Sequence, residues 1–382
     1  MDPRTPETLD TLRRTADPLA DATIAELFRT GRIQDVNLAL DALDRNDSPT
    51  PPDLPEPLRT YFDASSRLPP DFSPERFLRA QRAFALHGTA LGVALMYASL
   101  PTLYAGAMGG VQLLTMTGQL QNHYRRRAAE TLRFILDVME PGGFTPGGQG
   151  VRAIQKVRLV HATIRYFARH GGRWAALPEW GEPLNQEELS GTLLAFSVVA
   201  IDNARRLGAP LEQGQIEDLL YAWGVVGHLL GIRPEAVARD MDDGRALWKL
   251  VGQRNFAPTP QGATLGADHV AFLDDLVPGQ ALDGINLALS RWLMGPYVAN
   301  TCLSLPRPPW WTRFLVWLRP LLGLADRFSE ASRPVERLVE EIHLHLMESL
   351  QKWWAEGKSL PFRIPTRIGP HGTNDPSTET RA

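Results

Sequence analysis

The chain has 382 residues, of which 43% are hydrophobic and 22% are charged, the proportions of a globular protein that can bury one large core or two ordinary ones. Its 40 basic and 43 acidic side chains give a net charge of −3, which argues against a broad electrostatic surface for nucleic acid. Cys302 is the only cysteine, so an internal disulfide, a CxxC redox pair and a thiolate metal cage are excluded.

Residues 1–70 are expected to form an N-terminal segment of helices and loop. The apolar spacing predicts two short amphipathic helices within 17–45, and a proline-rich loop follows at 48–57. Residues 1–30 contain no apolar stretch of the kind found in export signals, and Arg13-Arg14 is not followed by a hydrophobic run. We therefore expect a cytoplasmic protein.

A stretch without any charge runs from residue 84 to residue 120. Its length alone would allow a membrane-spanning helix. Pro101 and six glycines interrupt it, which favours two helices packed inside the protein, where small residues let a flat ligand approach the backbone. Membrane association, including peripheral contact, remains the second interpretation.

The rest of the chain predicts helices and no strands. Apolar periodicity indicates helices at 119–139, 151–169, 186–206, 211–230, 234–253, 278–299, 309–324 and 334–355. No period-two alternation and no internal repeat is present. We expect an all-α fold with a single large helical domain at 71–355 and a polar, mobile tail at 356–382.

The helix predicted at 151–169 carries the most informative pattern. One of its sides is apolar apart from a single histidine: Ile154, Val157, His161, Ile164 and Ala168. Arg165 lies one turn beyond His161. A buried iron porphyrin needs an imidazole to bind the metal and a cation to pair with a propionate. On this helix alone, a histidine hydrogen-bonded within a core is the commoner alternative.

Polar residues on other apolar helix faces could complete such a site. Arg127 and Thr131 share a face at helical spacing, although Arg125-Arg126-Arg127 also fits a solvated surface cluster. Thr192 lies among apolar residues, where a threonine commonly bonds to its own backbone. Arg291 is also surrounded by apolar residues, so we expect an anion to pair with it.

Taken together and in order, these segments resemble the latex-clearing protein (rubber oxygenase) superfamily, which also includes the ER-bound oxygenase of mycophenolic acid biosynthesis. The matching segments are Arg127-x-x-Glu130-Thr131, the Lys-Val-Arg-Leu-Val-His-Ala-Thr-Ile-Arg run at 156–165, Thr192, the Trp-Gly-Val-Val-Gly-His-Leu-Leu-Gly-Ile run at 223–232, and Arg291. The resemblance covers roughly residues 71–310.

The resemblance implies a haem b, bound non-covalently in a globin-like helical core. Family members cleave an isoprenoid C=C bond with O2 and leave carbonyl ends. It further implies the residue roles: His161 as the proximal iron ligand, Arg165 and Arg291 as cofactor-binding residues, and Arg127, Thr131 and Thr192 as catalytic residues.

The sequence departs from the rubber-cleaving pattern at two positions. Glu130 stands where those members carry a lysine that can occupy the sixth iron position. Their catalytic glutamate is replaced by Gly109-Gly110-Val111-Gln112, with no acid nearby. Both changes make rubber a doubtful substrate. We hypothesise that Glu130 acts as the distal base or as an oxygen ligand; a salt bridge to Arg126 or Arg133 is the alternative.

The sequence therefore predicts a haem-dependent oxygenase acting on a smaller apolar, isoprenoid-type molecule. A haem or gas sensor without turnover, and a helical interaction module without haem, remain alternatives. Other histidines are weaker candidates: His228 is expected in the core, His343 and His345 point apart on one helix, and His87 and His123 could approach the distal face.

Overall fold

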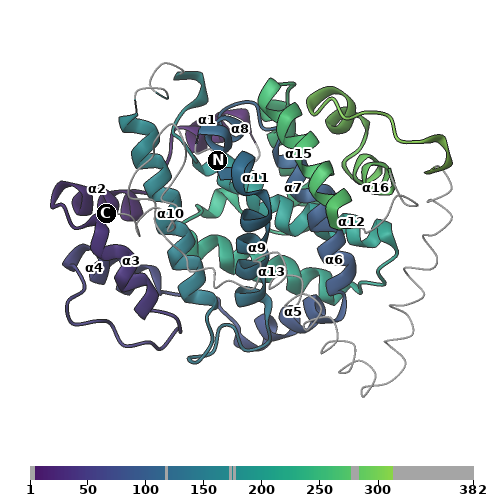
Figure 1. Cartoon of the computed structure of the whole chain (residues 1–382). Helices are drawn as coiled ribbons and strands as arrows, with labels where there is room; N and C mark the ends of the chain where they lie inside the picture. The colour runs from purple at the N-terminus through teal and green to yellow at the C-terminus, as the bar shows by residue number, and fades with distance from the viewer. Residues whose placement is uncertain (1–4, 117–118, 172–173, 175–177, 277–283, 313–382) are drawn as a thin grey trace.

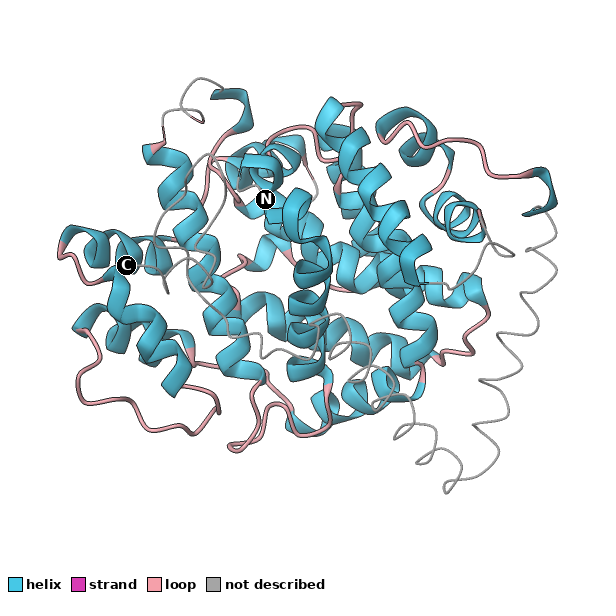
Figure 2. Cartoon of the chain, in the orientation of Figure 1, coloured by secondary structure: helices cyan, strands magenta, loops and turns pink. Residues whose placement is uncertain are grey.

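The structure is a computed structural model that describes residues 5–116, 119–171, 174, 178–276 and 284–312 (Figure 1). These residues form helices joined by loops, without a strand; one isolated antiparallel bridge joins Gly106 and Phe256 (Figure 2). The predicted all-α class is confirmed. The helix predicted at 334–355, almost all of that at 309–324, and the tail at 356–382 lie outside the described residues.

The α-helices follow one another along the chain as α1 (Pro6–Arg13), α2 (Pro18–Arg29), α3 (Ile33–Ala42), α4 (Glu56–Ser65), α5 (Pro74–Leu86), α6 (Gly88–Ala94), α7 (Leu100–Leu103), α8 (Gly110–Met116), α9 (Gln119–Met139), α10 (Gly150–His170), α11 (Gln186–Leu194), α12 (Ala200–Leu207), α13 (Gln213–Leu229), α14 (Met241–Asn255), α15 (Pro260–Leu276) and α16 (Ile285–Met294). Short 3-10 and π segments complete the set: η1 (Leu95–Ser99), η2 (Pro178–Trp180), η3 (Ala195–Val199), η4 (Pro234–Ala236) and η5 (Tyr297–Cys302).

Helix α15 is the largest element that the sequence analysis missed. It contains Gly262 and Gly266, which lower helix propensity. Both glycines pack closely: a Cβ added to Gly262 would lie 2.6 Å from the Tyr104 carbonyl oxygen, and one added to Gly266 would lie 3.1 Å from the Leu303 Cβ. Tertiary packing therefore overrides local preference here. The short helices α1 and α4 were missed as well.

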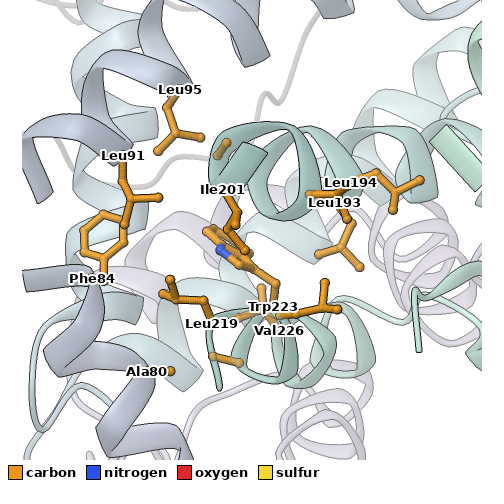
Figure 3. Packing of buried hydrophobic residues seen from close by; sticks show 14 of the residues in the cluster. Ala80, Phe84, Leu91, Leu95, Leu193, Leu194, Ile201, Leu219, Trp223 and Val226 are labelled. Carbon is orange, nitrogen blue, oxygen red and sulfur yellow. The ribbon is translucent and has the colours of Figure 1, made fainter. Parts of the chain in front are cut away.

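The main core lies where α5, α6, α11, α12 and α13 meet (Figure 3). Trp223 of α13 packs between Leu219 and Val226 of its own helix and Ile201 of α12, while Phe84 and Leu91 come from the charge-free stretch. Helix α13 can take this central position because nearly every turn of it buries one or more large apolar side chains.

The charge-free stretch at 84–120 forms the last residues of α5, then α6, the π segment η1, α7 and α8. Among the described residues no single helix is long and apolar enough to cross a membrane; Pro74–Leu86 and Gly88–Leu103 satisfy the criterion only together, and they bend by 82°. His87 at that bend is fully buried, with its Nε2 3.2 Å from Gln215 Oε1.

The N-terminal helices cover one face of α10. Leu159 and Ala162 of α10 share an apolar cluster with Ile24 of α2 and with Leu58 and Tyr61 of α4. The Tyr61 hydroxyl donates to the Gln155 carbonyl oxygen at 2.8 Å. His161 lies on another side of α10, on which Val157 packs against the main core.

Two π segments lie within long helices of the core. Segment η1 continues α6 into α7, and η3 continues α11 into α12. They meet where the Ser99 hydroxyl donates to the Ala195 carbonyl oxygen at 2.6 Å. Single π turns of this kind are frequent at functional sites, and η3 begins three residues after Thr192.

Candidate functional site

His161 of α10 is half-buried. It makes no hydrogen bond to any described residue. Burial, reinforced by the charges of Arg165 and Arg127, lowers its pKa to about 3. The imidazole is therefore neutral at physiological pH and presents a free lone pair, which is the form that binds a metal. The hydrogen-bonded core histidine considered above is not what the described residues form.

The surroundings of His161 are apolar on both sides along α10. Val157, one turn before it, packs against the main core. Ile164, just under one turn after it, packs against a separate cluster that contains Leu113 and Trp174. His161 lies between these two residues on the same side of α10, so its neighbours along the helix are apolar, which suits an apolar ligand.

Arg165 is 1% exposed and pairs with the N-terminal helix α2. Its Nε donates to Asp21 Oδ1 at 2.6 Å, while its Nη2 lies 3.9 Å from Asp17 Oδ2 and is a buried nitrogen without a hydrogen bond. A buried N–H without an acceptor is energetically costly. This nitrogen can therefore donate a hydrogen bond to an anionic oxygen, such as that of a haem propionate. With the neutral, unpartnered His161, these residues fit a haem.

A second arginine anchors α10 from its covered face. Arg158 donates from Nε and Nη2 to the two carboxylate oxygens of Asp17, at 2.6 and 2.8 Å, and the pair is almost entirely buried. Asp17 also caps α2, because its Oδ1 accepts from the Ala20 N–H at 3.5 Å. Neither Asp17 nor Asp21 was singled out from the sequence, since the spacing within α10 does not reveal which acids of a distant helix face it.

Helix α9 brings three of the predicted residues together. Glu130 accepts from Arg126 Nε at 3.0 Å and from Arg127 Nη1 at 2.6 Å. Thr131 donates its hydroxyl to the Arg127 carbonyl oxygen at 2.9 Å. The charge of Arg127 contributes to the lowered pKa of His161, so the guanidinium acts electrostatically on the imidazole. Of the salt bridges considered for Glu130, that with Arg126 is present, while Arg133 pairs with Asp137.

Thr192 and Arg291 make no described contact with His161. Thr192 is exposed and donates to the Glu188 carbonyl oxygen of its own helix at 2.9 Å. Arg291 donates to the Leu305 carbonyl oxygen at 2.7 Å and to the side-chain oxygen of Asn300. The acceptors of Arg291 are neutral oxygens and not the anion that its apolar surroundings predicted. The catalytic role of Thr192 and the cofactor-binding role of Arg291 stay predictions.

Among the described residues, the remaining histidines do not add a metal site. His228 is exposed, with Nε2 3.1 Å from the Arg67 carbonyl oxygen, so its predicted place in the core was wrong. His343 and His345 lie outside the described residues, as does the side chain of His123. Within the described ranges no group of three or more His, Cys, Asp or Glu could hold an ion, and a haem iron needs only one such protein ligand.

A buried chain of three polar rings was missed from the sequence. The hydroxyls of Tyr104 and Tyr124 are 2.6 Å apart, and Tyr124 also hydrogen-bonds to Nδ1 of His269. Burial lowers the pKa of His269 to about 4 and raises that of Tyr104 to about 12. Arg127 follows Tyr124 on α9 and acts on Tyr104 electrostatically. His269 lies on α15, the helix that was not predicted, so no sequence signal placed it here.

Comparison with known proteins agrees with the resemblance inferred from the motifs. Residues 78–342 match the family described as ER-bound oxygenase mpaB/B'/Rubber oxygenase, catalytic domain. The chain belongs to this family. A rubber oxygenase of Streptomyces sp. (strain K30) is 24% identical over 366 residues, covering 91% of this chain and 85% of that relative. The solved structure of latex clearing protein LCP in the closed state superposes with a TM-score of 0.71 at 22% identity, over 88% of this chain and 90% of that one, and thus shows the same fold.

Proposed function

We propose that this protein is a haem b-dependent oxygenase that cleaves a C=C bond of an apolar, isoprenoid-type molecule with O2. The observation that carries the proposal is the state of His161: a neutral, unpartnered and partly accessible imidazole between two apolar clusters, in a chain of the rubber oxygenase family. Family membership supports the oxygenase class; haem and the substrate belong to the proposal.

Haem, when bound, supplies the iron at which O2 reacts. The residues of this chain supply the rest. His161 would hold the iron, and Arg165 would donate from Nη2, which makes no hydrogen bond among the described residues, to a propionate. Asp17 and Asp21 fix α10 through Arg158 and Arg165, which keeps the imidazole in place.

On α9, Glu130 holds the guanidinium of Arg127 near His161 through a 2.6 Å ion pair. Because both carboxylate oxygens of Glu130 already accept from arginines, its geometry favours positioning Arg127 over acting as a free base. An arginine fixed in this way can donate hydrogen bonds to oxygen atoms of a ligand beside it. The apolar clusters on both sides of His161 exclude water and favour a hydrocarbon chain.

The substrate we favour is smaller than rubber. Glu130 replaces the lysine of the rubber-cleaving pattern and is committed to Arg126 and Arg127. The segment Gly109 to Gln112 supplies no carboxylate of its own. Two elements of the polymer-cleaving machinery are therefore absent from the positions where that pattern places them.

The test is oxygen uptake by the purified protein with squalene, a short isoprenoid hydrocarbon, in isotopically labelled O2. We expect O2 consumption and carbonyl products that carry the label. The variant His161→Ala should abolish both, whereas His228→Ala, which alters an exposed histidine, should not. A protein that holds haem but consumes no O2 with squalene or other isoprenoid alkenes would contradict the proposal and support a haem or gas carrier.

A further inference from the structure

Glu188 of α11 is an interior acid whose hydrogen bonding is incomplete. Its Oε2 accepts from the Asn185 N–H at 3.2 Å, as part of the capping box that starts the helix. Its Oε1 is buried and has no hydrogen-bond partner. Buried polar atoms are almost always paired, and leaving one unpaired is costly. The described residues therefore leave this atom without the partner that a buried oxygen ordinarily has.

The start of α8 approaches Glu188 very closely. A Cβ added to Gly109 would lie 2.9 Å from Glu188 Oε1 and 2.8 Å from Cη2 of Trp174. Gly109 also has φ +114°, a conformation that other residues rarely adopt. Glycine at this position is what allows the backbone, the indole and the carboxyl to meet.

This meeting point lies beside the side of α10 that carries His161. Trp174 packs in one cluster with Leu113 of α8 and with Ile164 and Ala168 of α10, which lie on the same side of α10 as His161. From His161 to Ala168 is about 10 Å along the helix axis, roughly the width of a porphyrin. Glu188 and Thr192, one turn apart, both keep accessible surface along one side of α11.

The charges around Glu188 determine its protonation. Burial, aided by the neighbouring Glu187, raises the pKa of Glu188 to about 8, against the opposing effects of the Asn185 N–H and of Arg13 on α1. Arg13 does not hydrogen-bond to Glu188, because it donates to Glu187 at 2.9 Å and to Asn255 of α14 at 2.8 Å. At neutral pH the carboxyl therefore keeps its proton and can donate a hydrogen bond.

We propose that Glu188 binds the oxygen atom of an oxygenated isoprenoid, with its carboxyl donating a hydrogen bond to a carbonyl group of the ligand. Glu188 is half-buried, and rotation about the carboxyl torsion, which is broad, can bring Oε1 to the accessible side of the residue. This assignment rests on the proposed function, since carbonyl-ended chains are the products of C=C cleavage. It names the ligand class as ketones or aldehydes with an apolar isoprenoid tail.

The test compares binding of geranylacetone, an isoprenoid ketone, with that of β-farnesene, a hydrocarbon of similar length. Quenching of tryptophan fluorescence in the full-length purified protein gives the ratio of the two dissociation constants. At pH 7 the preference for the ketone over the hydrocarbon should be about tenfold greater in the wild type than in Glu188→Leu. This factor corresponds to the free energy of one hydrogen bond. In the wild type the advantage should disappear as the pH rises through about 8.

Two further variants make the result specific. Glu188→Gln keeps an oxygen for the Asn185 N–H and donates from its amide, so it should retain a ketone preference that no longer depends on pH. Glu182→Gln, which changes an exposed carboxylate paired with Arg169, should behave as the wild type does. If Glu188→Leu does not fold, the pH profile of Glu188→Gln against that of the wild type decides.

Three outcomes would overturn the assignment: equal ratios in the wild type and Glu188→Leu, a wild-type ratio that does not change through pH 8, or the same pH dependence in Glu188→Gln. The measurement is of binding and needs no turnover. A pH-dependent ketone preference in a protein that consumes no O2 would contradict the proposed function and leave the role of Glu188 intact.

Discussion

The buried ion pair between Asp17 and Arg158 should contribute more to stability than any exposed pair. The variant Asp17→Asn keeps the size of the side chain and an oxygen that can still cap α2, but it removes the charge. Arg158 then retains its bond to the Leu229 carbonyl oxygen at 3.1 Å and loses two charge-assisted bonds of 2.6 and 2.8 Å. With the two side chains 10% and 3% exposed, an uncompensated guanidinium should cost about 3–5 kcal/mol of unfolding free energy.

Urea unfolding, followed by circular dichroism and by tryptophan fluorescence, measures this loss. Asp35→Asn is the matched control, because it breaks a pair with Arg32 whose side chains are both almost half exposed. We expect the control to lose less than about 1 kcal/mol. A loss below about 1 kcal/mol in Asp17→Asn, or one no larger than that of the control, would refute the reasoning that this pair fixes α10 to the N-terminal helices.

Three further predictions follow from other contacts. Gly109→Ala should lower stability by about 1–3 kcal/mol, because the added Cβ would overlap two side chains and because φ at this position is positive. Gly147→Ala, where nothing lies within 4 Å of the added Cβ, should be nearly neutral, and equal melting temperatures of the two variants would contradict this. Burial lowers the pKa of His269 from 6.5 to about 4, so the imidazole is protonated in the unfolded chain at a higher pH than in the folded protein, and stability falls as the pH drops from about 6.5 toward 4. The variant His269→Gln should remove up to about 3 kcal/mol of this loss, measured as the free energy of unfolding at a series of pH values. Glu130→Gln should leave haem content unchanged and shift the haem absorption spectrum, because Arg127 loses the carboxylate that holds it; an unaltered spectrum and turnover would reduce the pair to a surface contact.

The helices that form the site could be predicted because their apolar residues recur at helical spacing. The helix at 119–139 matches α9, and that at 151–169 extends by one residue at each end in α10. The apolar side of α10 with its single histidine was visible for the same reason. Helix α15 was not visible, since its glycines reflect contacts with segments far away in the chain.

Pairings between distant segments were beyond the sequence. The spacing of Arg165 from His161 indicated a cation near the imidazole, but nothing indicated Asp21 of α2 as its partner. Likewise, Gly109 and Gly110 were recognised as lacking an acid, and only the fold brings Glu188 to them from α11. A neighbour in space that is remote in the chain leaves no periodic signal.

The central claim is that His161 binds a haem iron. The most direct measurement is the absorption spectrum of the purified full-length protein, with its haem content determined as the pyridine haemochrome, for the wild type and His161→Ala. We expect an intense Soret band and about one haem per chain in the wild type, and loss of both in the variant with the helical circular dichroism retained. A wild-type protein that stays colourless after reconstitution with haem, or a variant that binds haem with the same spectrum, would contradict it.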